Sequence, residues 1–498
     1  MSSAPDDLRV RTLADRPEAA DGEYVLYWMT AFRRPYHNFA LDRAVDLARR
    51  LGKPVLVFEP LRAGYRWASE RFHRFVVEGM RANAAAFATS PIGYFPYLEP
   101  EAGAGSGLLE ELAKRACAVV GDDHPGFFLP ALARYAAARM PVKFEAVDSN
   151  GLLPLRAAAE VFELAHSFRR FLHRRLPPYL ERFPYPVAWE SEGPKLAPKP
   201  TVAAEILERW PALPAQNWES ALAKVDVDRS VSAVPGFPGG WEAGRRRLHD
   251  FLDRKLEGYP ERRGVPDEDG GSGLSPYLHF GFISTHEIFA ELARREKWKP
   301  EDLATKPTGS RAGWWNMSEA AESFLDELVT WREVGFNMAW QRRDYEKYAS
   351  LPEWARRSLA EHAGDPRPAI YSLEQLEAAE TYDELWNAAQ RQLVREGRIH
   401  NYLRMLWGKR VIEWTESPET ALEHLIELNN KYALDGRDPN SYSGIFWVFG
   451  RYDRAWGPER PIYGKIRYMS SENTARKTSV KGYLRRFGPE SPSLFSGE

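Results

Sequence analysis

Residues 399–414, IHNYLRMLWGKRVIEW, have the apolar spacing of a helix that presents one face to a protein core. Arg404 falls on or beside that face, and a buried guanidinium requires a carboxylate partner. The segment 428–440, LNNKYALDGRDPN, offers two such partners, Asp435 and Asp438. The stretch therefore predicts a helix that places a charged arginine at a hydrophobic core.

Two tryptophans of the same helix, Trp407 and Trp414, are two turns apart, about 10.5 Å along the axis at about 1.5 Å per residue. This separation suits electron hopping between indoles, and it also suits plain core packing. The chain holds 17 tryptophans, enough for an aromatic core in which a few indoles have other roles. The residues alone leave both interpretations open.

The pattern stays helical after Trp241, whereas the N-terminal third alternates short apolar runs with amphipathic segments. The runs predicted as strands are 24–29, 54–60, 92–98, 117–123 and 142–148, and the predicted helices between them are 38–52, 69–89, 107–115 and 129–139. This alternation favours a doubly wound parallel sheet. The expected fold class is an α/β N-terminal domain followed by an all-α domain.

Proline and glycine clusters between residues 187 and 240 (WESEGPKLAPKP, PALPAQ, VPGFPGG) predict a linker that lies over the surface. The expected organisation is therefore an α/β domain over 1–186, a linker over 187–240, a helical domain over 241–488 and a tail over 489–498.

Composition excludes several classes of protein. The single cysteine, Cys117, excludes an intramolecular disulfide, a cysteine-based zinc site and a cysteine-ligated iron–sulfur cluster. No apolar run approaches the roughly 18 residues of a membrane span, and residues 1–23 lack an apolar signal core. The net charge of −2 means that any nucleic-acid contact must come from a local patch. We expect a cytoplasmic protein without a metal centre.

Residues 270–284, GGSGLSPYLHFGFIS, contain a glycine-rich turn before a predicted helix start. Ser275 is the predicted cap, and the proline that follows it suits the first helical position. Exposed amides at such a start attract an anion, so a pyrophosphate would fit there. An ordinary capped loop is the alternative.

In the predicted helix 324–334, FLDELVTWREV, Glu327 and Trp331 stand four residues apart and so share one face. The carboxyl could bond the edge of a planar ring while the indole stacks on it. The alternative is a half-buried tryptophan beside a solvated acid.

Residues 451–486 form a basic segment, with ten Lys or Arg against three acids, a net charge of +7. Tyr452, Trp456, Tyr463 and Tyr468 interleave with these charges. This composition is typical of a surface that holds phosphates and stacks bases, and a solvated basic face is the alternative.

Five long motifs together resemble one family: SGLSPYLHFG, TYDELWNAAQ, LRMLWGKRVIEWTESPETAL, LDGRDPN and ERPIYGKIRYM. From about residue 25 to residue 486 the chain resembles the photolyase and cryptochrome family, and is most similar to the class II cyclobutane pyrimidine dimer photolyases. The resemblance implies an antenna-type α/β domain, which in some members holds a second chromophore, and a helical domain that holds FAD in a folded, U-shaped conformation.

The site residues that the resemblance implies fall into four groups. The flavin contacts are Tyr259, Ser272, Gly273, Leu274, Ser275, Arg404, Asn429, Asp435 and Asp438, with Arg404 and Asp435 paired beside the isoalloxazine ring and Asn429 facing its N5. The lesion pocket is Glu327, Trp331, Met405 and Trp447, and the loop that enters the duplex carries Arg454 and Trp456. The electron-transfer tryptophans are Trp386, Trp407 and Trp414. Glu327, Asn429, Arg404 and Asp435 are the implied catalytic residues.

The activity implied is light-driven DNA repair, in which excited, fully reduced FAD donates an electron to a flipped-out pyrimidine dimer. The implied partner is UV-damaged DNA, bound by a monomer, at the nucleoid in a bacterial cell. A cryptochrome-like blue-light photoreceptor, with the same flavin and tryptophans but no repair, is the rival prediction.

Three positions and the length of one segment depart from the class II pattern. Asn401 and Ser441 stand where glycine is usual, Tyr452 replaces a histidine, and WVFGRYD (447–453) is one residue short. Residues 29–41, MTAFRRPYHNFAL, also lack an acidic residue often found in that family segment, so the second chromophore is left undetermined.

Overall fold

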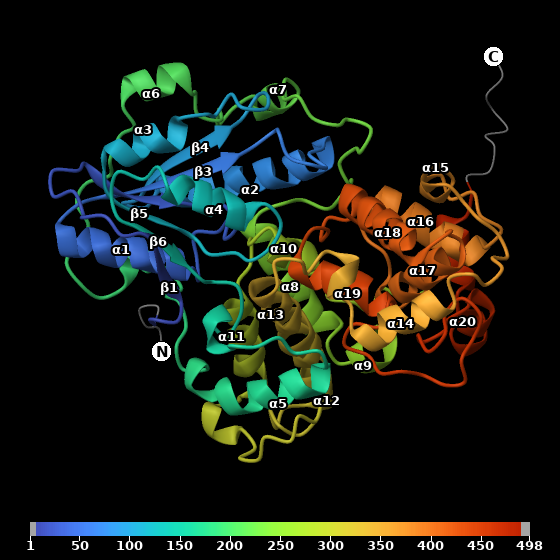
Figure 1. The fold of residues 1–498 in the computed structure, drawn as a ribbon. Helices are drawn as coiled ribbons and strands as arrows, with labels where there is room; N and C mark the ends of the chain where they lie inside the picture. Colours follow the sequence, from blue (N-terminus) through green and yellow to red (C-terminus); the bar gives the residue numbers. More distant parts are fainter. Residues whose placement is uncertain (1–5, 490–498) are drawn as a thin grey trace.

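The computed structural model describes residues 6–489 and begins with a six-stranded sheet in the order β1-β6-β5-β2-β3-β4 (Figure 1). Each of β2 to β6 pairs in parallel with its neighbours among these five, and β1 joins β6 antiparallel at one edge. The strands are β1 Val10–Ala14, β2 Tyr24–Trp28, β3 Val55–Leu61, β4 Gly93–Leu98, β5 Ala116–Asp122 and β6 Phe144–Val147. All five predicted strands are present, and the predicted fold class is confirmed.

The edge strand β1 is the strand of this sheet that sequence patterning misses. Its five residues, VRTLA, are only partly apolar, and Arg11 points to the surface side, where it makes a bidentate ion pair with Asp123 at 2.7 and 3.0 Å. A strand with one wet face and two polar residues gives no continuous apolar run. The central strand β2 shows the contrast, because every residue in it is buried.

Helices cover both faces of the sheet, as a doubly wound fold requires. Helix α1 (Phe39–Leu51) packs on one face, and α3 (Leu108–Lys114) and α4 (Leu129–Ala137) lie on the other (Figure 1). Helix α2 (Glu70–Ala88) packs against β3 and β4 and also enters the core of the helical part through Phe72 and Phe75. The two parts of the chain therefore share an apolar contact.

Residues 187–240 contain structure of their own. Two short helices, α6 (Ala204–Arg209) and α7 (Trp218–Leu222), pack on the α/β part. Trp210 is buried in the sheet core, and Trp218 is buried beside α2.

The rest of the chain is helical around one large core, which α5 (Ala165–Arg175) joins from the N-terminal side. The α-helices are α8 Trp241–Arg254, α9 Tyr259–Arg262, α10 Ser275–His279, α11 Thr285–Glu296, α12 Glu319–Leu325, α13 Arg332–Gln341, α14 Glu353–Glu361, α15 Leu373–Glu377, α16 Glu384–Glu396, α17 Asn401–Glu413, α18 Pro418–Tyr432, α19 Pro439–Val448, α20 Ser471–Lys477 and α21 Lys481–Phe487. Short 3-10 turns are η1 Leu155–Ala157, η2 Pro177–Tyr179, η3 Ala188–Glu190, η4 Pro300–Asp302 and η6 Tyr348–Ser350. The predicted helix from residue 399 is thus α17.

One turn departs from α geometry. Asp326–Trp331, labelled η5, is a π-helix between α12 and α13, whereas the sequence predicts an uninterrupted α-helix. The wider turn changes the direction in which Glu327 and Trp331 project. Single π turns of this kind are frequent at functional sites.

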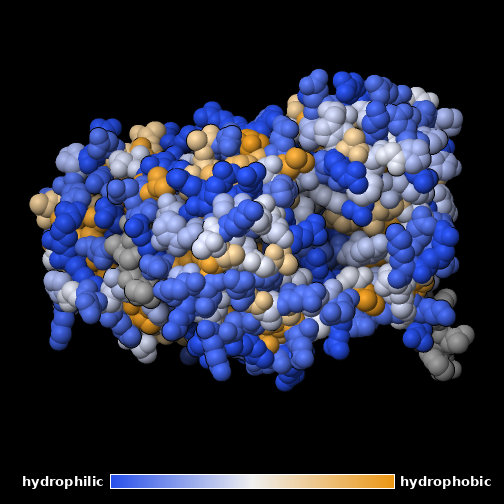
Figure 2. All heavy atoms as spheres, turned by 90° about the horizontal axis from the view of Figure 1, so that it is seen from below, coloured by the Kyte–Doolittle hydropathy of each residue, from blue (hydrophilic) through white to orange (hydrophobic). Residues whose placement is uncertain are grey.

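Among residues 6–489, none of the helices combines the length and apolarity needed to cross a bilayer. The face of the molecule in Figure 2 is mostly hydrophilic, with apolar residues in small scattered groups. Within the same described range, no cluster of His, Cys, Asp or Glu could hold a metal ion. The predicted tail, 489–498, lies outside the described residues except for its first residue.

Candidate functional site

Arg404 on α17 forms a bidentate ion pair with Asp435, which follows α18. The two nitrogen–oxygen distances are 2.9 Å (Nη2 to Oδ1) and 3.3 Å (Nη1 to Oδ2), and the side chains are 15% and 17% exposed. Arg404 Nε is buried and has no protein partner. The pair is therefore a nearly dry charged group that retains a free donor.

Asp438, the other candidate partner, has a different role. It caps α19, where its Oδ1 accepts from the Asn440 amide at 2.8 Å and its Oδ2 lies 3.4 Å from His279 Nδ1. Burial alone would raise the pKa of this carboxyl, but His279 and the nearby Arg332 hold its pKa below the usual value. Asp438 therefore stays ionised, which suits a cap and an acceptor.

Asn429 lies buried on α18, with its amide orientation defined by two neighbours. Its Nδ2 donates to Asn430 Oδ1 at 3.1 Å and to Ser441 Oγ at 3.0 Å. The serine that departs from the family pattern thus makes a direct hydrogen bond to a predicted flavin contact.

The glycine-rich turn differs from its prediction in one detail. Ser275 is the first residue of α10 instead of its cap; Leu274 occupies the cap position, and no side chain caps the helix. Ser272 Oγ accepts from the Leu274 amide at 3.4 Å, and Gly273 has a φ of +68°, in the region that favours glycine. The first amides of α10 therefore have no side-chain acceptor.

Glu327 forms an ion pair with Arg263, a residue that sequence reasoning missed. Both side chains are about one-third exposed, so the pair is partly open to solvent. The Arg263 guanidinium also lies 5.5 Å from the ring of Tyr259, whose phenol pKa is raised by burial and by Glu327. No local spacing could reveal this pair, because 64 residues separate its members.

Helix α19 links the other predicted lesion residues. Trp331 meets Tyr452, just beyond α19, edge-on at 6.5 Å between ring centroids. The Met405 methyl group lies 3.9 Å from the place where a Cβ on Gly444 of α19 would stand, one turn before the half-buried Trp447. Helices α13 and α17 both pack against α19, and the structure thereby brings these side chains to one region.

Lys409, on α17, is a second residue that the sequence did not single out. It is fully buried, donates to the Val448 carbonyl at the end of α19, and lies 5.4 Å from the ring of Trp447. Burial lowers the pKa of its ammonium to about 7, against the raising effect of Asp453. A buried lysine amid a run of apolar residues is a weak signal in the sequence, because lysine normally lies at the surface.

This pKa predicts how stability depends on pH. In the unfolded chain Lys409 titrates near 10.5, so between pH 7 and 10.5 the unfolded state binds the extra proton and stability rises with pH. Relative to Lys409→Met, the wild type should gain about 1.4 kcal/mol of unfolding free energy per pH unit above pH 7. Denaturant unfolding followed by tryptophan fluorescence at pH 7 and 8.5 measures it. Lys477→Met, at an exposed position, is the control. If the wild type gains as much unfolding free energy with pH relative to Lys477→Met, the lowered pKa does not belong to Lys409.

The three predicted electron-transfer tryptophans pack against one another. Trp386 stacks on Trp407 at 6.4 Å between centroids and 8° between planes, and meets Trp414 edge-on at 5.4 Å. Trp386 Nε1 donates to the Trp407 carbonyl at 2.9 Å, and Trp407 Nε1 donates to Gln390 Oε1 at 2.9 Å. The order in space is therefore Trp407, Trp386, Trp414.

The basic segment 451–486 is largely, though not wholly, a surface. Arg451 is 1% exposed and donates to the Tyr345 carbonyl at 2.8 Å, so it belongs to the core. The other nine basic residues are exposed: Arg454, Arg460, Lys465, Arg467, Arg476, Lys477, Lys481, Arg485 and Arg486. Arg467 lies over both Trp456 (4.8 Å) and Trp447 (5.6 Å), and Arg454 also lies over Trp456 (4.3 Å). The predicted loop residues therefore adjoin the predicted lesion pocket.

Comparison with known proteins gives long matches. The chain is 34% identical to a deoxyribodipyrimidine photo-lyase of Methanothermobacter thermautotrophicus over 96% of this chain and 97% of that protein. It is 33% identical to one from Arabidopsis thaliana, over 92% of this chain and 88% of that protein, and 31% identical to one from Potorous tridactylus, over 97% and 84%. No family model matches the sequence.

Solved structures give the same fold at low identity. A bacterial class III photolyase from Agrobacterium tumefaciens superposes with a TM-score of 0.65 at 17% identity, covering 94% of this chain and 86% of that one. A cryptochrome from Synechocystis also has a TM-score of 0.65, at 15% identity, over 93% and 88%. The long matches to three photo-lyases, on a fold that these two structures share, show that the chain belongs to the photolyase and cryptochrome family.

Proposed function

We propose that this protein is a class II-like deoxyribodipyrimidine photolyase that splits cyclobutane pyrimidine dimers in DNA under near-UV or blue light. One observation carries the proposal. A chain 34% identical to a photo-lyase over nearly its whole length carries Glu327, Trp331, Met405 and Trp447 where its motifs resemble the lesion pocket of the family, and it packs α13 and α17 against α19. The class II assignment rests on the motifs of the helical domain.

The family implies a flavin, and the residues of the helical domain fit FAD. Arg404 Nε is a buried donor without a partner, and the first amides of α10 have no side-chain cap. Gly271 has open space where a side chain would stand. We propose that the turn 271–275 holds the phosphates, with Tyr259 beside them, and that Arg404, Asp435, Asp438 and Asn429 hold the flavin ring.

When bound, reduced FAD supplies the electron that splits the cyclobutane ring and takes it back. The chain supplies binding, orientation and electrostatics. Glu327 would hydrogen-bond a pyrimidine edge, held in place by Arg263, while Trp331 and Trp447 pack on the extrahelical bases. Trp414, Trp386 and Trp407 would carry electrons inward to reduce an oxidised flavin.

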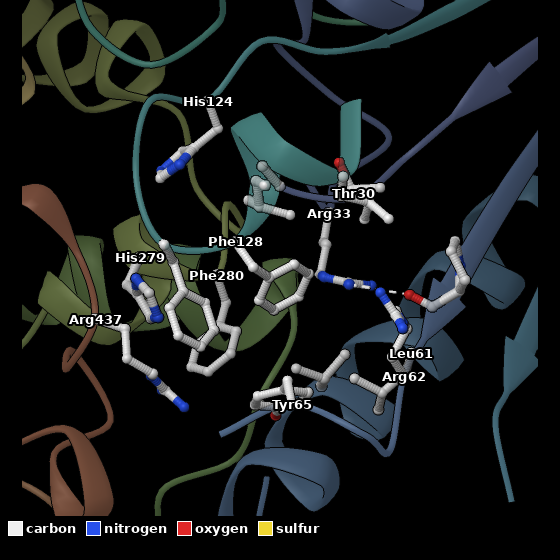
Figure 3. A pocket seen from close by; sticks show the side chains of 16 residues that line it. Thr30, Arg33, Leu61, Arg62, Tyr65, His124, Phe128, His279, Phe280 and Arg437 are labelled. Carbon is white, nitrogen blue, oxygen red and sulfur yellow. Dashed lines mark hydrogen bonds between the residues drawn. The ribbon is translucent and has the colours of Figure 1, made fainter. Parts of the chain in front are cut away.

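A pocket between the two parts of the chain is our proposed site for a second chromophore (Figure 3). It lies beyond the carboxyl ends of β2 and β5, where the strand order reverses and α/β sheets usually bind ligands. Asp122 shapes its floor by accepting from the amides of Thr30 and Ala31 at 2.8 and 2.6 Å.

The pocket suits a flat aromatic molecule with an acceptor oxygen. Phe128 and Phe280 line it between Arg437 on one side and Arg33 on the other, and its cavity volume is about 100 Å³. Arg437 Nη2 is buried without a partner, whereas Arg33 is already paired with Glu59. An absorption band besides the flavin bands in the purified protein tests this site.

Damaged DNA is the partner that the family function implies. We propose that it lies along the exposed basic residues of segment 451–486, which carry Arg454 and Trp456 toward the duplex. We propose that the protein acts as a monomer. The substrate places the protein with the DNA, in the cytoplasm and at the nucleoid of a bacterial cell.

A cryptochrome-like photoreceptor is the second candidate, and binding in the dark separates the two. Stacking of an extrahelical base on an aromatic ring contributes about 1–3 kcal/mol, so a photolyase should bind a duplex with one thymine dimer about ten- to a hundredfold more tightly than the undamaged duplex. Equal affinity for the two duplexes would favour the photoreceptor.

A further inference from the structure

The tryptophan chain stops short of water. Trp407, Trp386 and Trp414 are 1%, 0% and 0% exposed, so the last indole is as buried as the first. A chain that ends at Trp414 therefore has no contact with solvent. An oxidised Trp414 needs a neighbour that can donate an electron to it and release a proton to solvent.

Tyr382 is that neighbour. Trp414 Nε1 donates a hydrogen bond to the Tyr382 hydroxyl at 3.1 Å, and the two rings meet edge-on at 5.5 Å between centroids. Tyr382 is 55% exposed, although aromatic rings usually bury more of their surface. It immediately precedes Asp383, whose side chain caps α16 through the amides of Leu385 and Trp386, so its backbone is held at the start of the helix that carries Trp386.

We propose that Tyr382 is the terminal electron donor of this aromatic chain, an inference that rests on the proposed function. After Trp414 has lost one electron inward through Trp386 and Trp407, the Tyr382 phenol gives one electron to the Trp414 radical cation and its proton to bulk water. Trp414 returns to its neutral closed-shell form, and a neutral tyrosyl radical remains at the surface. A thiol in solution restores Tyr382 by giving one electron and one proton.

A second tyrosine, Tyr371, touches the same indole and serves as a matched control. Its ring lies 5.5 Å from that of Trp414, so distance does not distinguish the two tyrosines. Tyr371 is half-buried, and its hydroxyl accepts from the Tyr382 amide at 3.1 Å instead of from the indole. Tyr382 is therefore the better donor of the two, because its ring reaches solvent and its hydroxyl accepts a hydrogen bond from the Trp414 indole.

The charges around Trp414 do not oppose this step. Arg410 lies 4.9 Å from the Trp414 ring and 5.6 Å from the Tyr382 ring. It is paired with Asp383 at 2.9 Å and with Glu413, so its charge is balanced locally. Trp414 has no direct contact with bulk water that could take its proton, whereas exposed Tyr382 loses its charge when its phenol proton leaves.

The test is flash excitation of the protein loaded with oxidised FAD, followed by transient absorption and electron paramagnetic resonance. The wild type and Tyr371→Phe should form a tyrosyl radical, more slowly in D2O because a proton leaves. Tyr382→Phe should lack that signal, stop at a tryptophanyl radical and lose the separated charges severalfold faster. A tyrosyl signal that survives in Tyr382→Phe, or a wild type that shows only a tryptophanyl radical, would overturn the assignment.

Two further measurements separate failure of this inference from failure of the proposed function. Chemically reduced Tyr382→Phe should repair dimers at the wild-type rate, because the chain serves flavin reduction only. Trp407→Phe should photoreduce more slowly than the wild type. If Trp407→Phe photoreduces normally, the tryptophan chain itself is wrong, and the Tyr382 assignment fails with it.

Discussion

Arg404→Met should be purified with little flavin and should unfold more easily than the wild type. The substitution leaves Asp435 mostly buried, at 17% exposure, without its cation. Removing one partner of a buried pair costs about 3–5 kcal/mol, and we expect the lower end because both side chains keep some contact with water. Flavin absorbance per protein and the denaturation midpoint measure the two effects.

The double variant Arg404→Met with Asp435→Leu separates stability from cofactor binding. With both charges removed, no uncompensated carboxylate remains, so the unfolding free energy should recover toward the wild-type value. Flavin content should stay low, because the ring has lost its charged contacts. A double variant that is stable and fully loaded with FAD would show that this pair does not hold the flavin.

Glu327→Gln should bind FAD normally but repair dimers about ten- to a hundredfold more slowly. The amide keeps the shape of the side chain and loses the charge that pairs with Arg263 and strengthens the bond to a pyrimidine. A hydrogen bond to a charged group contributes about 1.5–3 kcal/mol, which corresponds to this range of rates. Single-turnover repair under constant light measures it.

Glu319→Gln is the matched control for that variant. Glu319 is exposed on α12, just before the π-helix, and should tolerate the amide without loss of repair. If Glu327→Gln repairs at the wild-type rate while binding damaged DNA normally, the carboxyl has no role in the chemistry.

The parts of the fold that were predicted correctly depend on continuous apolar runs. Strands buried on both faces, such as β2, leave such a run in the sequence, and Gly52 marks the end of α1 with a φ of +64°. The edge strand β1 and the π-helix at Asp326–Trp331 leave no such pattern, because one is half-polar and the other is a local widening within an otherwise helical run.

Some features of the candidate site could likewise be predicted from the sequence, and others could not. The sequence predicts that Arg404 pairs with a carboxylate, but it offers both Asp435 and Asp438. The structure shows that Asp435 is the partner and that Asp438 caps α19. Arg263 and Tyr382 gain their roles from distant partners, Glu327 and Trp414, which no spacing along the chain connects. Side chains whose function depends on such long-range contacts require the three-dimensional structure.

Light-dependent repair by the reduced protein tests the central claim most directly. Chemically reduced, FAD-loaded protein is mixed without oxygen with a duplex that carries one thymine dimer, and intact thymines are counted after blue light and after an equal time in the dark. The account predicts restored thymines in the light, none in the dark, and a strongly reduced yield with Glu327→Gln. Dimers that remain intact under light, in a protein shown to hold reduced FAD, would contradict it.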